Sequence, residues 1–171
     1  LVTGSAGGGA VMVAGTGTCS IKGNIGNNCA SGDCSFVGGG GGTSGFENRA
    51  FGTWSTISGG NSNTVCCSNS TISGGYLNTA SSACSAIVGG ERNCANNIFA
   101  FVGGGQCNTA NSTFSTIVGG SGNNASYGGF IGGGGATVPF GTSGNSASVM
   151  AAIVGGGSNS SSGAFSFIGG G

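Results

Sequence analysis

Six charged side chains are the groups in this 171-residue chain that could do acid–base chemistry. In chain order they are Lys22, Asp33, Glu47, Arg49, Glu91 and Arg92. General acid–base catalysis needs such groups placed near one another, most often with a His. The chain has no His, and its charged residues are scattered apart from the neighbours Glu91 and Arg92. We therefore expect no catalytic residues, no cofactor and no enzymatic activity.

Thiols are the second reactive group of the chain. The eight cysteines are Cys19, Cys29, Cys34, Cys66, Cys67, Cys84, Cys94 and Cys107. Spacings such as that from Cys29 to Cys34 do not match zinc sites, and we expect no bound metal. Two interpretations stay open: disulfides formed in an oxidising compartment, or small buried apolar side chains.

The composition limits the partners. Only 4 % of the residues are charged and the formal net charge is zero, whereas an ordinary domain is about a quarter charged. Nucleic-acid binding needs clustered Lys and Arg, and a membrane span needs about 20 apolar residues in a row; the sequence has neither. Surfaces of Ser, Thr, Asn and Gly occur on fibres, so we expect an extracellular, cell-surface or virion-surface location.

A repeat of about fifteen residues organises the chain. It is centred on Ser-x-Ile-x-Gly-Gly, with one Ile or Val anchor in each copy. The anchors are Val37, Ile57, Ile72, Ile87, Val102, Ile117, Ile131, Ile153 and Ile168. A disordered Gly- and Ser-rich tract is not expected to keep Ile or Val at such a regular spacing. The repeat predicts an all-β parallel β-solenoid with one coil per copy.

A second signature, Asn-x-Ala or a close variant, follows most anchors at a constant distance. Its asparagines after successive anchors are Asn63, Asn78, Asn93, Asn108, Asn123 and Asn159. Asn28, Asn48 and Asn145 precede anchors in the same way, so the extra residues fall in the Gly-rich turn at 38–47 and 132–144. The repeated Asn has two open explanations: an amide ladder from coil to coil, or tolerance of a left-handed backbone.

Side chains alternate along a strand, so the anchor shares a face with the small residue two positions before it. We place the anchors, these small residues and the Ala of Asn-x-Ala inside a narrow coil. Bulky residues one and three positions before the anchor then lie outside, in an apolar stripe. The stripe comprises Phe36, Trp54, Phe99, Phe101, Phe114, Phe130, Met150, Phe165 and Phe167. Because exposed stripes of this size mark interfaces, we expect the chain to bind copies of itself.

The expected domains are a cap, linker or docking segment at 1–18 and the solenoid at 19–171. The segment Val11–Val13 fits the repeat register poorly. We interpret the whole chain as a piece of a longer one, because it starts without Met and stops within a repeat.

The stretches Ser-Thr-Ile-Ser-Gly-Gly, Ser-Ala-Ile-Val-Gly-Gly and Ser-Thr-Ile-Val-Gly-Gly, each followed by Asn-x-Ala or Asn-x-Val, carry a family resemblance. From Cys19 to Gly171 the chain resembles the head repeats of trimeric autotransporter adhesins, which also occur in phage and large-virus fibre proteins. The resemblance implies a left-handed β-roll, three chains side by side and attachment to a surface.

These observations favour a structural subunit or shaft of an extracellular or virion fibre. One alternative is an adhesive head that binds a cell-surface receptor or glycan through the turn insertions, with Trp54 and Phe140 as the aromatics to test. Another is an ice-binding solenoid, since the coil length and the segments at 56–59, 63–65 and 71–74 also resemble grass ice-binding β-rolls. Smaller features are Cys94 and Cys107 in neighbouring coils and glycosylation sequons at Asn69, Asn111, Asn124 and Asn159.

Overall fold

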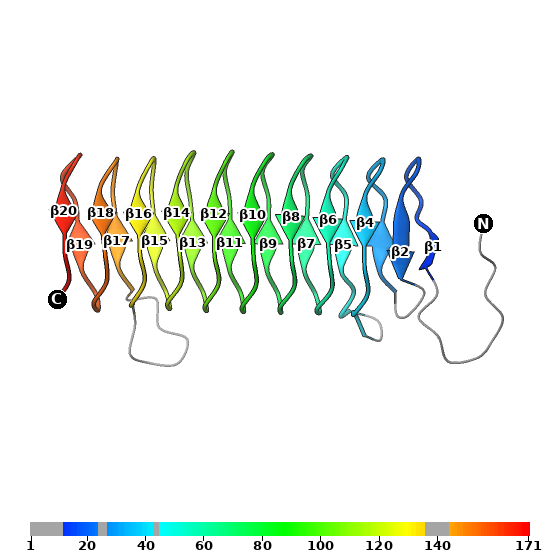
Figure 1. The fold of residues 1–171 in the computed structure, drawn as a ribbon, viewed down its shortest axis with the longest axis horizontal. Coiled ribbons are helices and arrows are strands. Elements are labelled where there is room, and N and C mark those ends of the chain that lie inside the picture. The colour runs from blue at the N-terminus through cyan, green and yellow to red at the C-terminus, as the bar shows by residue number, and fades with distance from the viewer. Residues whose placement is uncertain (1–11, 24–26, 43–44, 136–143) are drawn as a thin grey trace.

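The computed structural model describes residues 12–23, 27–42, 45–135 and 144–171. The chain forms a β-solenoid of about nine turns with about fifteen residues each, which Figure 1 shows as a long row of superimposed coils. The described residues contain no helix. The predicted fold class, an all-β parallel β-solenoid, is therefore confirmed.

Each coil contributes one short strand to each of two sheets. Sheet A has eleven strands and contains the anchors: β1 (Met12–Ala14), β2 (Ile21–Gly23), β4 (Phe36–Val37), β6 (Thr56–Ile57), β8 (Thr71–Ile72), β10 (Ala86–Ile87), β12 (Phe101–Val102), β14 (Thr116–Ile117), β16 (Phe130–Ile131), β18 (Ala152–Ile153) and β20 (Phe167–Ile168). Sheet B has nine strands and contains the Asn-x-Ala segments: β3 (Cys29–Ala30), β5 (Arg49–Ala50), β7 (Thr64–Val65), β9 (Thr79–Ala80), β11 (Cys94–Ala95), β13 (Thr109–Ala110), β15 (Asn124–Ala125), β17 (Ser146–Ala147) and β19 (Ser160–Ser161).

Successive coils lie in register. Ile57 is opposite Ile72 and Ile72 is opposite Ile87 in parallel pairs, and the register continues across the irregular step from Ile131 to Ile153. A two-residue strand would be unstable alone, but in a solenoid its backbone groups bond to the coils on either side. The insertions at 38–47 and 132–144 therefore leave the sheets intact, although 43–44 and 136–143 lie outside the described residues.

The interior is narrow and mixed in polarity. The anchors from Val37 to Ile153 are fully buried, and Ile168 in the last coil is partly buried. Small residues two positions before the anchor, such as Ser55 and Ala100, are buried beside them. From sheet B the interior receives Ala or Val and, two positions earlier in the same coil, the repeated Asn. Each coil from Val37 to Ile153 thus buries one aliphatic anchor, and Val65 adds a second aliphatic side chain from sheet B.

The N-terminal end differs from the other coils. Strand β1 pairs antiparallel with β2, where Val13 lies opposite Lys22. Lys22 itself is in register with the anchor Val37, and its Nζ donates a hydrogen bond to the carbonyl of Asn28 at 2.8 Å. A partly buried Lys therefore occupies the anchor position of the first coil. Most of the expected segment 1–18 lies outside the described residues, so its role as a cap, linker or docking segment stays a prediction.

Two turns connect the sheets, one on each long side of the solenoid. We call the first the glycine edge; it follows the anchor, and its second Gly has a positive φ, as at Gly60 and Gly75 (φ 87° and 95°). The described parts of both insertions, 38–42 with 45–47 and 132–135 with 144, belong to this edge. We call the second the apolar edge; it precedes the anchor and ends in a residue with φ near 55°, as at Trp54 and Phe99. Non-glycine residues rarely adopt this backbone conformation.

Candidate functional site

The charged residues, considered first as catalytic candidates, all have structural partners. Glu47 pairs with Arg49 and Glu91 pairs with Arg92. The Asp33 carboxylate accepts a hydrogen bond from the backbone amide of Thr18 at 2.8 Å. A backbone hydrogen bond at Glu47 itself, and then the side chain of Arg49, lower the pKa of Glu47. In the described part of the chain, no three His, Cys, Asp or Glu side chains are placed to hold a metal ion.

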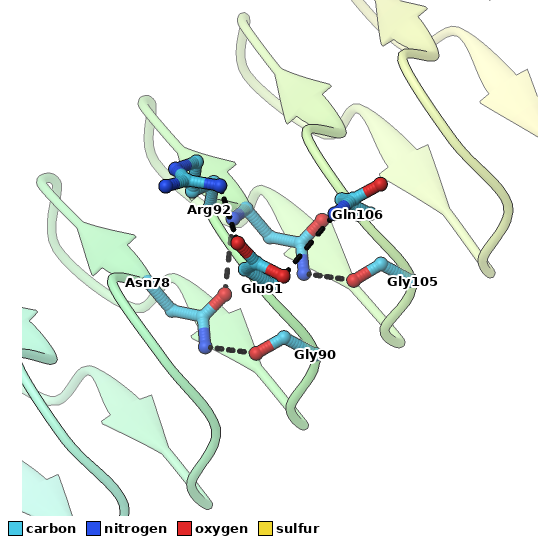
Figure 2. Close-up of polar contacts among 7 residues, drawn as sticks. Asn78, Gly90, Glu91, Arg92, Gly105 and Gln106 are labelled. Carbon is cyan, nitrogen blue, oxygen red and sulfur yellow. Dashed lines mark hydrogen bonds and ion pairs between the residues drawn. The ribbon is translucent and has the colours of Figure 1, made fainter. Parts of the chain in front are cut away.

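The Glu91–Arg92 pair belongs to a polar cluster on the glycine edge (Figure 2). Gln106, one coil further on, donates its amide hydrogen to Glu91 Oε2 at 3.1 Å. On the other side, the Arg92 guanidinium lies 6.0 Å from the ring centroid of Tyr76. The cluster therefore joins three consecutive coils through polar contacts at the surface.

Directly beneath this cluster runs the ladder of repeated asparagines. The Asn93 backbone amide donates to Asn78 Oδ1 at 3.0 Å, and Asn93 Nδ2 donates to the carbonyls of Gly89 and Gly105, each at 2.9 Å. Figure 2 shows the equivalent bond from Asn78 to Gly90. All six predicted ladder residues, and also Asn28, Asn48 and Asn145, make this kind of bond between coils. No ladder Asn is among the described residues with positive φ, so the amide contacts account for the repeated Asn.

The predicted apolar stripe lies on the outer surface, where it forms two adjacent rows. The row on the apolar edge consists of Trp54, Phe99, Phe114, Met150 and Phe165. The row on the outer face of sheet A consists of Phe36, Phe101, Phe130 and Phe167. All nine are exposed except Phe101, which is half-buried. Exposure reaches 61 % at Trp54 and 78 % at Phe165.

Neighbouring turn residues widen the row on the apolar edge. Phe51, Ile98, Tyr127 and Val149 are also exposed there. The rings of Phe99 and Phe114 stack with centroids 5.3 Å apart, and Phe114 meets Tyr127 edge to face at 6.5 Å. Asp33 is the one charged residue described on this edge. The arrangement can exclude water from a second apolar surface, and few charges oppose such contact.

Other predicted features are placed as follows. Trp54 lies on the apolar edge and not beside the insertions, so its role in adhesive contacts stays a prediction; Phe140 lies outside the described residues. Thr rows are short: Thr56 faces Thr71 on sheet A and Thr64 faces Thr79 on sheet B, but Ala86 and Cys94 follow them.

The four sequon asparagines divide into two groups. The side chains of Asn69, Asn111 and Asn124 are exposed. Asn159 instead donates its amide to Gly155 and Gly171 as part of the ladder. The first three are therefore accessible to modification in the folded chain, whereas Asn159 is partly buried and its amide is engaged in ladder hydrogen bonds.

Sequence reasoning missed two features. The first is the burial of the repeated Asn side chains, which line the interior, whereas the sequence placed them only at a turn. Residue type gave no indication of the positive φ at one turn position, because none of these residue types favours that conformation. The residues are Trp54, Phe99, Phe114, Met150 and Phe165. The regular spacing of bulky residues three positions before the anchor was the available sign of a special turn.

No family model matches this chain, and no curated protein matches it significantly. The described residues include no helix that is long and apolar enough to span a membrane.

Proposed function

We propose that this chain is a structural subunit or shaft of an extracellular or virion fibre and binds copies of itself along the apolar edge. The observation that carries the proposal is the row of exposed bulky side chains at one turn position, from Trp54 to Phe165. A solenoid extends in one dimension and displays the same position at each coil. Two such rows can therefore lie along one another over the length of the molecule.

The size of the surface supports this association. A fully exposed large side chain presents roughly 200 Å². The nine described hydrophobic residues on the apolar edge are about half exposed, which gives on the order of 900 Å². A stable interface buries about 800 Å² on each partner, so the apolar edge alone is of the size that a specific contact needs.

The thin interior supports it as well. Each coil buries one Ile or Val anchor, which contributes about 1.5–3 kcal/mol. Hydrogen bonds between coils contribute, and burying the apolar edge against other copies adds apolar area that a single chain lacks.

Sedimentation velocity of the full chain tests the proposal. We expect the native protein to sediment as an oligomer at micromolar concentration, and the double variant Phe99→Ser/Phe114→Ser to dissociate at least tenfold more readily. The matched control is Leu77→Ser, which removes an exposed apolar residue of the glycine edge. A native chain that sediments as a monomer, or equal effects of the two variants, would refute association through this edge; electron micrographs then show whether the oligomer is filamentous.

A second candidate, an adhesive head for a receptor or glycan, is favoured by one observation. Tyr76, Glu91, Arg92 and Gln106 place an aromatic ring and hydrogen-bonding groups together on the glycine edge (Figure 2). Such groups are the usual means of orienting a polar ligand. A glycan-array screen of the chain and of the variant Tyr76→Ala/Glu91→Ala distinguishes this function, since only adhesion predicts binding that the variant loses.

A further inference from the structure

Cys19 and Cys34 occupy the same turn position in the first two coils. Strand β2 pairs with β4 so that Ile21 lies opposite Phe36, and each Cys precedes its strand residue by two positions. The Cys34 amide donates to the carbonyl of Thr18 at 2.7 Å, which fixes the two turns against one another. The two thiols are therefore direct neighbours across adjacent coils.

The two turns have the same conformation. The φ angles of Cys19 and Cys34 are 56° and 54°. In both turns the following Ser donates its amide to the Gly three positions before it, Ser20 to Gly17 at 3.2 Å and Ser35 to Gly32 at 3.1 Å. Because the turns match, their Cα atoms are separated by about the spacing of neighbouring strands, 4.7–4.9 Å. Disulfides need Cα atoms 4.4–6.8 Å apart, and this pair fits.

Side chains at this position also run parallel. Further along the same row, Phe99 and Phe114 stack with an interplanar angle of 4° and centroids 5.3 Å apart. The Cβ atoms of a disulfide lie about 3.5–4.5 Å apart, so a small approach of the two turns would bring the Cys side chains within bonding range. Both thiols are free and exposed in this structure, so an oxidant can reach them.

We propose that Cys19 and Cys34 form a disulfide that staples the first coil of the solenoid to the second. The oxidant is a low-molecular-weight disulfide such as oxidised glutathione. One Cys thiolate attacks it, forming a mixed disulfide and releasing one glutathione; the other Cys thiolate attacks the mixed disulfide and releases the second glutathione. Each thiol loses its proton, and the two electrons reduce the oxidant.

The bond protects the end of the solenoid where the aliphatic stack finishes. Lys22 occupies the anchor position there. On its outer side this coil pairs with the short antiparallel strand β1 and not with another parallel coil, so we expect it to open more readily than the coils inside the stack. Opening of this coil exposes Lys22 to trypsin. A disulfide that closes a loop of about fifteen residues restricts the opened state and is expected to slow this cleavage by up to about 100-fold.

Peptide mapping of the full chain tests the proposal. After exposure to oxidised glutathione, free thiols are alkylated and the unfolded chain is digested with trypsin, which cuts after Lys22 and so separates Cys19 from Cys34. We expect the fragments 1–22 and 23–49 to remain joined without reductant and to separate with it. The matched control is Cys29→Ser, which removes the other thiol of fragment 23–49 and should leave the link intact, whereas Cys34→Ser should abolish it.

Three results would overturn the proposal. The first is full alkylation of Cys19 and Cys34 after oxidation. The second is a link that survives Cys34→Ser and disappears in Cys29→Ser. The third is a Cys19 link to a thiol elsewhere, such as Cys94 or Cys107. On the folded chain, cleavage after Lys22 relative to cleavage after the exposed Arg92 should slow on oxidation and recover on reduction. Equal rates before and after oxidation would show that the bond does not secure this coil.

Discussion

Replacing one rung of the asparagine ladder tests how much of the fold depends on polar contacts in the interior. Asn123 and Asn124 are consecutive residues of the same type in opposite environments. The Asn123 side chain is buried and donates to the carbonyls of Gly119 and Gly134 at 2.9 and 3.0 Å. Its Oδ1 accepts the backbone amide of Asn145 at 2.8 Å. Asn124 points outward and is exposed.

The variant Asn123→Ala removes these contacts while keeping a small side chain. Leaving a buried donor or acceptor unpaired costs about 1–3 kcal/mol. The Asn145 amide and the Gly119 carbonyl lose their partner, and the Gly134 carbonyl keeps its bond from the Ser121 amide. We therefore expect the free energy of unfolding to fall by about 3–5 kcal/mol, against about 0.5 kcal/mol or less for Asn124→Ala.

Urea unfolding followed by circular dichroism measures the difference. Because repeat proteins can unfold in segments, the midpoint and the slope of the transition are compared for both variants. The reasoning is refuted if Asn123→Ala and Asn124→Ala shift the midpoint equally. Such a result would mean that water or relaxed neighbours replace the ladder contacts without loss.

Three further predictions concern the interior, a turn and a surface. Ile87→Ala should lower the free energy of unfolding by about 2–5 kcal/mol, because it empties a closely packed site, whereas Val88→Ala on the exposed neighbour should change it by less than about 0.5 kcal/mol; thermal denaturation compares the two. Gly90→Ala should lower the free energy of unfolding by at least about 2 kcal/mol, because Gly90 has a φ of 88° and an added Cβ would lie 2.1 Å from the Gly105 carbonyl oxygen. Gly89→Ala should be tolerated, because a Cβ added there meets no atom within 4 Å. The full chain should show no thermal hysteresis beyond that of an inert protein, because its outward Thr rows are interrupted; clear hysteresis in a nanolitre osmometer would restore the ice-binding alternative.

The architecture could be predicted because the constant spacing of the anchors is visible in the sequence. Ile57, Ile72 and Ile87 recur at intervals that only a stacked coil converts into a continuous interior. Because the insertions fall in one turn, the strands on either side keep their register, and the repeat remained recognisable. The same logic placed the Phe residues outside, since a coil of fifteen residues has no space for a ring beside an Ile.

Features that depend on backbone dihedral angles or on the ends of the stack could not be predicted. Phe114 has a φ of 60°, a conformation that residue preferences assign to Gly or Asn. Lys22 in the anchor register could not be recognised, because its copy of the repeat lacks Ser-x-Ile-x-Gly-Gly and a charged residue is not expected in an interior. It is accommodated because the side chain is only partly buried and the Asn28 carbonyl accepts its ammonium hydrogen.

The side chains of the apolar edge are themselves an argument for association. A non-glycine residue in the left-handed region costs about 1–2 kcal/mol, and the chain uses Gly at this position in one coil, Gly128. Stacking of Phe99 on Phe114 returns about 0.5–1.5 kcal/mol. The described neighbours of Trp54 in the row, Cys34 and Asn69, offer no ring. The glycine edge also has non-glycine residues with positive φ, such as Leu77 and Arg92, so the backbone cost alone does not distinguish the two edges. What distinguishes the apolar edge is the bulk and exposure of its side chains. Burial of a Trp or Phe by another copy would exceed the backbone cost, and for this reason we propose association along this edge.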